Sequence, residues 1–238
     1  MVMNSFEFVF YHIPKCGGTS LRDFFRQLYL ENGFHQEDIY ISVVSQNIPD
    51  VMNHDILTQL LPVLNTKKIL LAHINHNLYP ILPSKFNITC IRNPIHRFIS
   101  SFNHFTLQIS PDSNLEQLYI TDKTQFDKIC TNCYRCPSKA WFRDNILDFN
   151  FIIILENLEV DLKYVTKMLG FKTEIAVPYI DPCKQNKIKS NHFKFDMNNA
   201  LHREMYEYIT CRLSKDIAIY NKICIMRSLS DTFLIKNK

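Results

Sequence analysis

The segment FEFVFYHIPKCGGTSLRDFF, residues 6–25, is the most informative part of the sequence for the fold. Residues 6–12 mix apolar and aromatic side chains over the length of a strand, and turn-forming residues end this run. Gly17 and Gly18 follow, and they are half of the four glycines in the chain. Apolar residues then recur at helical spacing over residues 19–31. The segment therefore predicts a strand, a tight loop and a helix.

The remaining sequence alternates short apolar runs with amphipathic stretches. Because the strand-like runs are apolar on both faces, the pattern predicts an α/β fold with a parallel sheet flanked by helices. Further strands are expected at residues 67–74, 86–91 and 148–156. Further helices are expected from residue 53 or 54 to 61, from 94 to about 105, and at 157–171 and 197–223, with irregular chain elsewhere in 32–66, 106–140 and 172–196.

The composition is typical of a folded protein, and it leaves most classes of function open. It has 238 residues, of which 46% are hydrophobic and 21% charged, so we expect one domain over residues 1–238. The net charge is +4 and the pI is about 8.5, which permits an anionic substrate. No dense block of lysine and arginine is present, so we expect no nucleic-acid partner.

The predicted loop at residues 15–20 has the chemistry of an anion site. A helix N-terminus presents unpaired N–H groups and the positive end of the helix dipole. Glycines let the backbone approach a ligand closely, Lys15 adds a cation, and Thr19 and Ser20 add hydroxyl groups. A nucleotide-triphosphate loop would carry its lysine after the glycines, whereas here it precedes them. The alternative is a plain turn with a solvated lysine.

A second candidate anion site lies in CIRNPIHRFISSF, residues 90–102. Arg92 follows a predicted strand, and Pro94 is suited to the first turn of a helix. The guanidinium of Arg92 offers a fork of donors for a phosphate, and Ser100 adds a hydroxyl on the helix. The alternative is a surface arginine and an ordinary serine on a helix face.

Together, HIPKCGGTSL and IRNPIHRFISSF resemble the two signatures of the sulfotransferases that use 3′-phosphoadenosine 5′-phosphosulfate (PAPS). The resemblance is closest to the carbohydrate branch, which includes the heparan sulfate 2-O-sulfotransferases. It implies an α/β fold akin to nucleotide kinases and PAPS as co-substrate, with 3′-phosphoadenosine 5′-phosphate (PAP) as product. It also implies a hydroxyl acceptor, which in this branch is a glycan. Because a sulfuryl group carries less charge than a phosphoryl group, we expect no metal requirement.

The resemblance assigns roles to particular residues of this chain. The first signature implies that the 5′-phosphosulfate is held by Lys15, Cys16, Gly17, Gly18, Thr19 and Ser20. The second implies that Arg92 and Ser100 hold the 3′-phosphate. Cys16 stands where threonine is common and Asn93 where aspartate is common, but neither departure removes a donor that the anion sites need.

Transfer of a sulfuryl group to an alcohol needs a base for the hydroxyl proton and stabilisation of the leaving phosphate. The cationic side chain of Lys15 is suited to stabilise the negative charge of the leaving phosphate. In the related enzymes the base is a histidine after a small residue at a strand end, which maps onto His73 after Ala72. The alternatives are His76, His12 and Glu156.

The N-terminal sequence has no signal-peptide pattern, and no apolar run approaches the roughly 18 residues of a membrane span. If the chain is complete, these features predict a cytoplasmic protein; if it is a shortened form, the resemblance points to the Golgi lumen.

Other function classes remain as alternatives. One is a nucleotide-dependent small-molecule kinase of similar fold, and another is a non-catalytic relative that binds an anionic glycan. Cys130, Cys133 and Cys136 have close spacing, and with Cys183 they would form a zinc site in an interaction protein. The favoured interpretation of these cysteines is that they are ordinary thiols.

Overall fold

The computed structural model describes residues 4–41, 54–74, 82–109, 114–134, 149–172 and 193–228. The chain divides into two compact units. The first comprises Met1–Ile91, Ala140–Tyr179 and Met226–Lys238, and the second comprises Arg92–Lys139 and Ile180–Ile225. The single domain over residues 1–238 stays a prediction, and each unit is described separately below.

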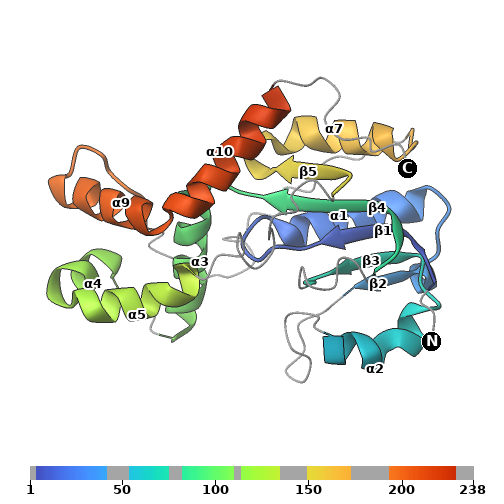
Figure 1. Ribbon diagram of the computed structural model, residues 1–238, viewed down its shortest axis with the longest axis horizontal. Coiled ribbons are helices and arrows are strands. Elements are labelled where there is room, and N and C mark those ends of the chain that lie inside the picture. Colours follow the sequence, from blue (N-terminus) through green and yellow to red (C-terminus); the bar gives the residue numbers. More distant parts are fainter. Residues whose placement is uncertain are drawn as a thin grey trace. The chain divides into compact units, whose positions relative to one another are not determined.

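The first unit is built on a five-stranded sheet in the order β2-β3-β1-β4-β5 (Figure 1). All four strand pairings are parallel, which confirms the predicted α/β fold with a parallel sheet flanked by helices. The strands are β1 (Phe6–Tyr11), β2 (Ile39–Ile41), β3 (Ile69–Ala72), β4 (Ser84–Ile91) and β5 (Phe151–Ile154).

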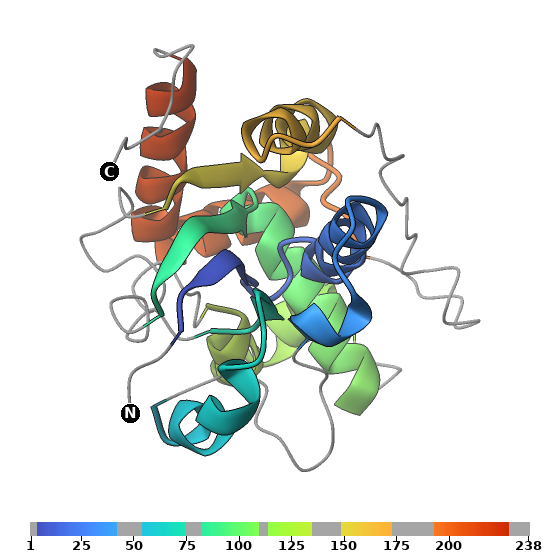
Figure 2. The ribbon, with the colours of Figure 1, turned by 90° about the vertical axis from the view of Figure 1, so that its right-hand side faces the viewer.

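The helices of this unit cover the sheet and bury their apolar stripes against it. Helices α1 (Gly18–Glu31) and α7 (Leu158–Met168) lie on the same face of the sheet (Figure 2). In α1, Phe25 packs on Phe8 of β1 with their ring centroids 4.8 Å apart. The unit also contains α2 (His54–Leu64) and the 3-10 turns η1 (Gln36–Asp38) and η4 (Leu155–Asn157).

Strand β2 was not expected, because residues 32–66 were predicted to be irregular except for one helix. The strand has only three residues, too few for a readable alternation of apolar and polar side chains. Its pairing partner decides its conformation, since Ile39 aligns with Ile69 of β3. Helix α2 begins at His54, as predicted, and continues to Leu64 with Pro62 in its last turn.

The second unit is helical, with one apolar cluster at its centre. Its helices are α3 (Pro94–Ile109), α4 (Leu115–Thr121), α5 (Lys123–Tyr134), α9 (Ala200–Arg212) and most of α10 (Ser214–Ser228). The cluster is formed by Ile95, Phe98, Phe102, Leu115, Tyr119, Phe126, Met205, Ile209 and Leu213. Among the described residues, no helix is long and apolar enough to cross a membrane.

Two predictions about this unit were wrong. Residues 197–223 were expected to form one helix, but Leu213 leaves helical geometry and its side chain, 1% exposed, enters the core. Residues 106–140 were expected to be irregular, but they contain α4 and α5. Capping signals were present for both helices, because Asn114 accepts from the N–H of Glu116 at 2.8 Å and Asp122 accepts from the N–H of Gln125 at 2.8 Å.

A buried ion pair ties the end of α10 to the sheet of the first unit. Both nitrogens of the Arg227 fork donate to the Asp161 carboxylate at 2.6 Å. Asp161 is fully buried and also accepts from the backbone N–H of Ile154 at 2.7 Å. The Arg227 guanidinium lies 4.8 Å from the centre of the Phe151 ring. Within the first unit, strand β5, helix α7 and the last residues of α10, from Met226 on, therefore share one charge pair.

We expect Arg227→Leu to lower the free energy of unfolding by about 3 kcal/mol, because it leaves the Asp161 carboxylate buried without its cation. Urea unfolding measures this change. Lys163→Leu is the control, since Lys163 pairs with Glu159 on the exposed surface of α7. It should cost less than about 1 kcal/mol. Equal losses of unfolding free energy in the two variants would contradict the view that the buried Asp161–Arg227 pair stabilises the protein more than an exposed pair does.

Candidate functional site

The loop between β1 and α1 has an unusual backbone. Lys15 has φ of 66° and Gly17 has φ of 73°, so both lie in the left-handed region. A non-glycine residue seldom adopts this conformation, and such residues are concentrated at functional sites. The N–H of Cys16 donates to the carbonyl of Ile13 at 3.3 Å, and the Cys16 side chain is 2% exposed. The loop thus holds Lys15 at the carboxyl end of β1 in one defined turn.

The N-terminus of α1 is suited to an anion. Among the described residues, no side chain caps this helix, and its first turn contains no acidic residue. By contrast, Asn114 and Asn199 cap α4 and α9 through their side chains. Thr19 is exposed and Ser20 is half-buried in the same turn. The first N–H groups of α1 therefore keep their capacity to bind an acidic group.

The two glycines are required for different reasons. Gly17 has a positive φ, and a Cβ there would also lie 2.6 Å from Leu155 Cδ1. Gly18 is helical, but a Cβ there would lie 1.6 Å from the Cδ2 and Nε2 atoms of the His12 ring. The imidazole of His12 therefore occupies the space next to Gly18, and only glycine fits at that position.

His12 and His73 form a stacked pair at the carboxyl ends of β1 and β3. Their ring centroids are 3.7 Å apart with 27° between the ring planes, and the residues are 5% and 9% exposed. The Nδ1 of His73 lies 2.9 Å from the backbone carbonyl of His12. A carbonyl oxygen only accepts, so in this arrangement Nδ1 of His73 carries the proton. The lone pair of neutral His73 is then on Nε2, which gives this atom the character of a base.

The surroundings of His12 keep its imidazole neutral. Burial is the main cause that lowers the pKa of His12 well below its usual value of 6.5. His73, when it is protonated, and the permanent charges of Arg22 and Lys15 lower the pKa of His12 further, because each opposes a second positive charge nearby. Among the described residues, the buried Nδ1 of His12 has no hydrogen-bond partner. The two histidines therefore differ: His73 donates a hydrogen bond through Nδ1, whereas His12 is a neutral buried ring.

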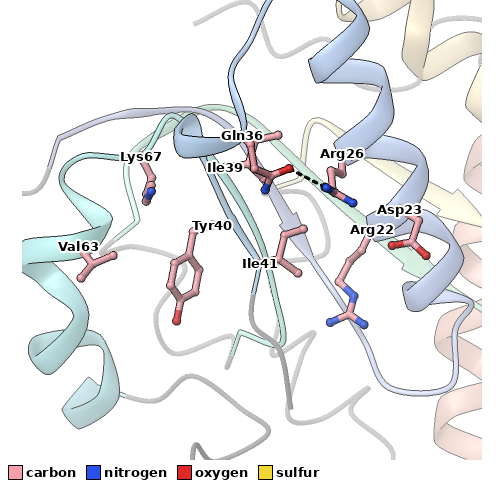
Figure 3. Close-up of a pocket in the computed structure, with 9 residues that line it drawn as sticks. All are labelled: Arg22, Asp23, Arg26, Gln36, Ile39, Tyr40, Ile41, Val63 and Lys67. Atoms are coloured by element: carbon pink, nitrogen blue, oxygen red, sulfur yellow. Dashed lines mark hydrogen bonds between the residues drawn. The ribbon is translucent and has the colours of Figure 1, made fainter. Parts of the chain in front are cut away.

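A cavity of about 690 Å³ lies beside β2 in the same unit (Figure 3). Helices α1 and α2 lie on either side of it, with the strand between them. Its lining consists of Arg22, Asp23, Arg26, Gln36, Ile39, Tyr40, Ile41, Val63 and Lys67. The sequence analysis missed this cavity, although the two arginines one helical turn apart on α1 were a visible signal.

The second predicted signature belongs to the second unit. Arg92 directly follows β4 and is half-buried, and Ser100 is half-buried on α3. The side chain of Asn93 caps α3 by accepting from the N–H groups of Ile95 at 3.0 Å and His96 at 3.3 Å. An asparagine thus performs the capping role here. Because the loop at 15–20 belongs to the first unit, a donor site that joins the two signatures stays a prediction.

The other candidate residues are placed only in part. Glu156 is exposed in η4, after β5. His76, Cys136 and Cys183 lie outside the described residues, as do the side chains of Cys130 and Cys133 on α5. Within the described ranges, no three His, Cys, Asp or Glu side chains form a group able to hold a metal ion. The zinc alternative and the metal-free prediction both remain untested.

Comparison with known proteins identifies the family. The family model described as "Sulfotransferase family" matches residues 1–222, which include parts of both compact units. The chain belongs to the sulfotransferase family. It is therefore a transferase of the sulfotransferase class, and this part of the sequence prediction is confirmed.

Two further comparisons add less. A solved structure of a sulfotransferase from Alicyclobacillus acidocaldarius is 15% identical over 91% of this chain and 97% of that chain, with a TM-score of 0.44. No curated protein matches the chain. The carbohydrate branch, the donor and the individual site residues of this sulfotransferase are therefore proposals.

We expect Gly18→Ala to lower the free energy of unfolding by about 2 kcal/mol and to displace the His12 ring, because the new methyl group needs its space. Nitrogen NMR of labelled histidines would report the displacement as a changed tautomer signal of His73. Gly33→Ala is the control: Gly33 has φ of 89°, but a Cβ there would have no neighbour within 4 Å. This variant should lose stability and keep the His73 signal. Unchanged histidine spectra in Gly18→Ala would contradict the packing argument.

We also expect the lowered pKa of His12 to make the protein less stable in acid. Below pH 6.5 the unfolded chain binds a proton at residue 12 that the folded protein excludes, so the stability contribution present at neutral pH is lost as the pH falls. The slope from this residue is at most about 1.4 kcal/mol per pH unit. Urea unfolding between pH 7.5 and 5.5 should give a shallower slope for His12→Phe than for wild type. His35→Phe, at an exposed position, is the control. Equal slopes in wild type and His12→Phe would contradict this expectation.

Proposed function

We propose that this sulfotransferase moves the sulfuryl group of PAPS to a hydroxyl of a carbohydrate acceptor, with His73 as the base. The main support is the hydrogen bond from His73 Nδ1 to the carbonyl of His12, because it assigns the ring proton to Nδ1 and the lone pair of the neutral ring to Nε2. The anion-binding turn lies at the end of β1, and β1 and β3 are neighbouring parallel strands. Acid–base and anion-binding groups thus come from one edge of the sheet.

Donor binding is proposed to use both predicted signatures. In the first unit, Lys15 and the uncapped N–H groups at Gly17 and Gly18 would hold the 5′-phosphosulfate, and Thr19 and Ser20 would add their hydroxyl groups. Cys16 would shape this loop, because its N–H donates to the carbonyl of Ile13. In the second unit, Arg92 and Ser100 would hold the 3′-phosphate. The backbone N–H groups at Gly17 and Gly18 are already oriented by the turn and the helix, which lowers the ordering cost of binding.

The proposed reaction is an in-line displacement at sulfur. As the acceptor oxygen forms its bond to sulfur, His73 Nε2 takes the hydroxyl proton, and the bond between sulfur and the phosphate oxygen of PAP breaks. Lys15 and the N-terminus of α1 stabilise the charge that develops on the departing phosphate. His73 then returns its proton to solvent. No further reactant is needed, and every protein group in this scheme belongs to the chain.

The carbohydrate acceptor is proposed from the two signatures, which resemble those of the carbohydrate branch. The kinase alternative is disfavoured because Lys15 precedes the glycines, whereas a nucleotide-triphosphate loop needs a lysine after them.

Calorimetry with PAP, compared with ATP and magnesium, tests the proposed donor. We expect the protein to bind PAP and not ATP with magnesium. The affinity for PAP should be at least about tenfold weaker in Lys15→Ala, because the variant loses a charged contact with the 5′-phosphate. Lys163→Ala should bind like wild type. We expect His73→Ala to keep the affinity for PAP but to lose transfer of radiolabelled sulfate to a glycan by about a hundredfold or more.

Two outcomes would contradict the proposal. Binding of ATP with magnesium and not of PAP would favour the kinase, and full transfer by His73→Ala would remove the base assignment. Retained PAP affinity in His73→Ala separates a chemical role of the histidine from a role in folding.

A further inference from the structure

The cavity beside β2 runs along the outer edge of the sheet. Strand β2 stands at one end of the strand order, and among the described residues only β3 pairs with it. Ile39, Tyr40 and Ile41 all line the cavity. Because successive side chains of a strand point to opposite faces of the sheet, a cavity on one face would not be lined by all three. The cavity therefore follows the edge of β2, where main-chain N–H and C=O groups can pair with a further strand.

The surroundings of this edge leave room for an extended peptide. Helices α1 and α2 lie on either side of β2 in Figure 3, so an added strand would lie between two helices, as the strands inside the sheet do. The volume of about 690 Å³ is in the range of sites that bind organic molecules. Such a volume is suited to a short segment of peptide.

The lining of the cavity has an excess of positive charge. Its charged members are Arg22, Arg26, Lys67 and Asp23. Arg26 donates to the side-chain amide oxygen of Gln36 at 2.8 Å, and Lys67 donates to the backbone carbonyl of Glu37 at 2.5 Å. Both acceptors are neutral. Within the described ranges, no carboxylate forms an ion pair with Arg26 or Lys67, so the cavity favours an acidic ligand.

The spacing of the cations matches the geometry of a strand. Arg22 and Arg26 are one helical turn apart on α1, with about 5–6 Å between their Cβ atoms. In an extended peptide, residues i and i+2 point to the same face and are about 6.6 Å apart. Lys67 lies on the α2 side of β2 in Figure 3, opposite the two arginines, where residue i+1 of the peptide would point. Acidic residues at i, i+1 and i+2 would thus each face a cation.

We propose that an extended acidic segment of a protein partner binds along β2 as an additional strand of the sheet. Its main chain pairs with residues 39–41, and its carboxylates face Arg22 and Arg26 on one side and Lys67 on the other. The exposed strand edge favours a peptide over an acidic glycan, because a peptide offers main-chain donors and acceptors at the repeat of a strand. The described lining contains no histidine and no residue of the turn at 15–20, so the partner is not placed as the acceptor of the reaction.

Calorimetry with a short synthetic peptide tests the proposal. The probe is acetyl-Val-Thr-Glu-Glu-Glu-Thr-Val-amide, and its analogue with three glutamines in place of the glutamates is measured alongside. We expect the acidic peptide to bind, more weakly as salt is added, and the glutamine analogue to bind at least about tenfold more weakly. The double variant Arg26→Gln/Lys67→Gln should also bind the acidic peptide at least about tenfold more weakly. Lys163→Gln, which removes an exposed lysine of α7, should bind it like wild type.

Two N-methylated forms of the acidic peptide separate strand pairing from attraction between charges alone. One form is methylated on the main-chain nitrogens of its second, fourth and sixth residues, and the other on those of its third and fifth. Because successive N–H groups of a strand point to opposite sides, one form loses the donors that face β2 and should bind at least about tenfold more weakly. The other form should keep its affinity. Binding of the unmethylated peptide should also slow the exchange of amide hydrogens at residues 39–41.

Several results would overturn the proposal. The first is failure of the acidic peptide to bind, or equal binding of its glutamine analogue; both are measured on wild type and do not depend on the folding of a variant. Equal affinities of the two N-methylated forms would reduce the contact to charge attraction. Unsulfated chondroitin tetrasaccharide, an acidic glycan, should bind more weakly than the peptide, and tighter binding that is lost in the double variant would assign the cavity to a glycan instead. Competition between PAP and the peptide would assign it to the donor.

Discussion

The close approach of the His12 ring to the backbone of Gly18 constrains the whole candidate site. The imidazole fills the space that a side chain at residue 18 would need, so the first turn of α1 packs directly on the residue that follows β1. The same ring stacks on His73, and the His12 carbonyl accepts from His73 Nδ1. One residue thus relates the position of the helix N-terminus to the orientation of the proposed base.

The parallel sheet explains why these groups meet. In a parallel sheet the strands end at a common edge, and β1 and β3 bring the turn at Lys15 and the side chain of His73 to it. The cavity instead lies at the side of the sheet, next to the edge strand β2. Helix α1 supplies two arginines to its lining. Helix α1 therefore contributes its N-terminus to the proposed donor site and its polar side chains to the cavity beside β2.

Much of the fold was readable because its signals are local. The strand, turn and helix of residues 6–31 follow one another, and each has a clear pattern of apolar residues and glycines. The failures were short elements. Strand β2 exists because β3 offers it hydrogen bonds, and the interruption at Leu213 follows from the burial of one leucine in the helical core. Neither cause is visible in a window of neighbouring residues.

The amino-acid order alone was enough to identify the two signatures, the family and the turn chemistry at Lys15–Ser20, because glycines, hydroxyl groups and capping residues act on their own neighbours. Through the resemblance to the related enzymes, it also favoured His73, after Ala72 at a strand end, as the base. The proton position on His73, the neutral state of His12 and the cationic cavity at β2 required the folded chain. They arise from contacts between residues such as His12 and His73, which are 61 positions apart, and from burial that changes the free energy of a charge.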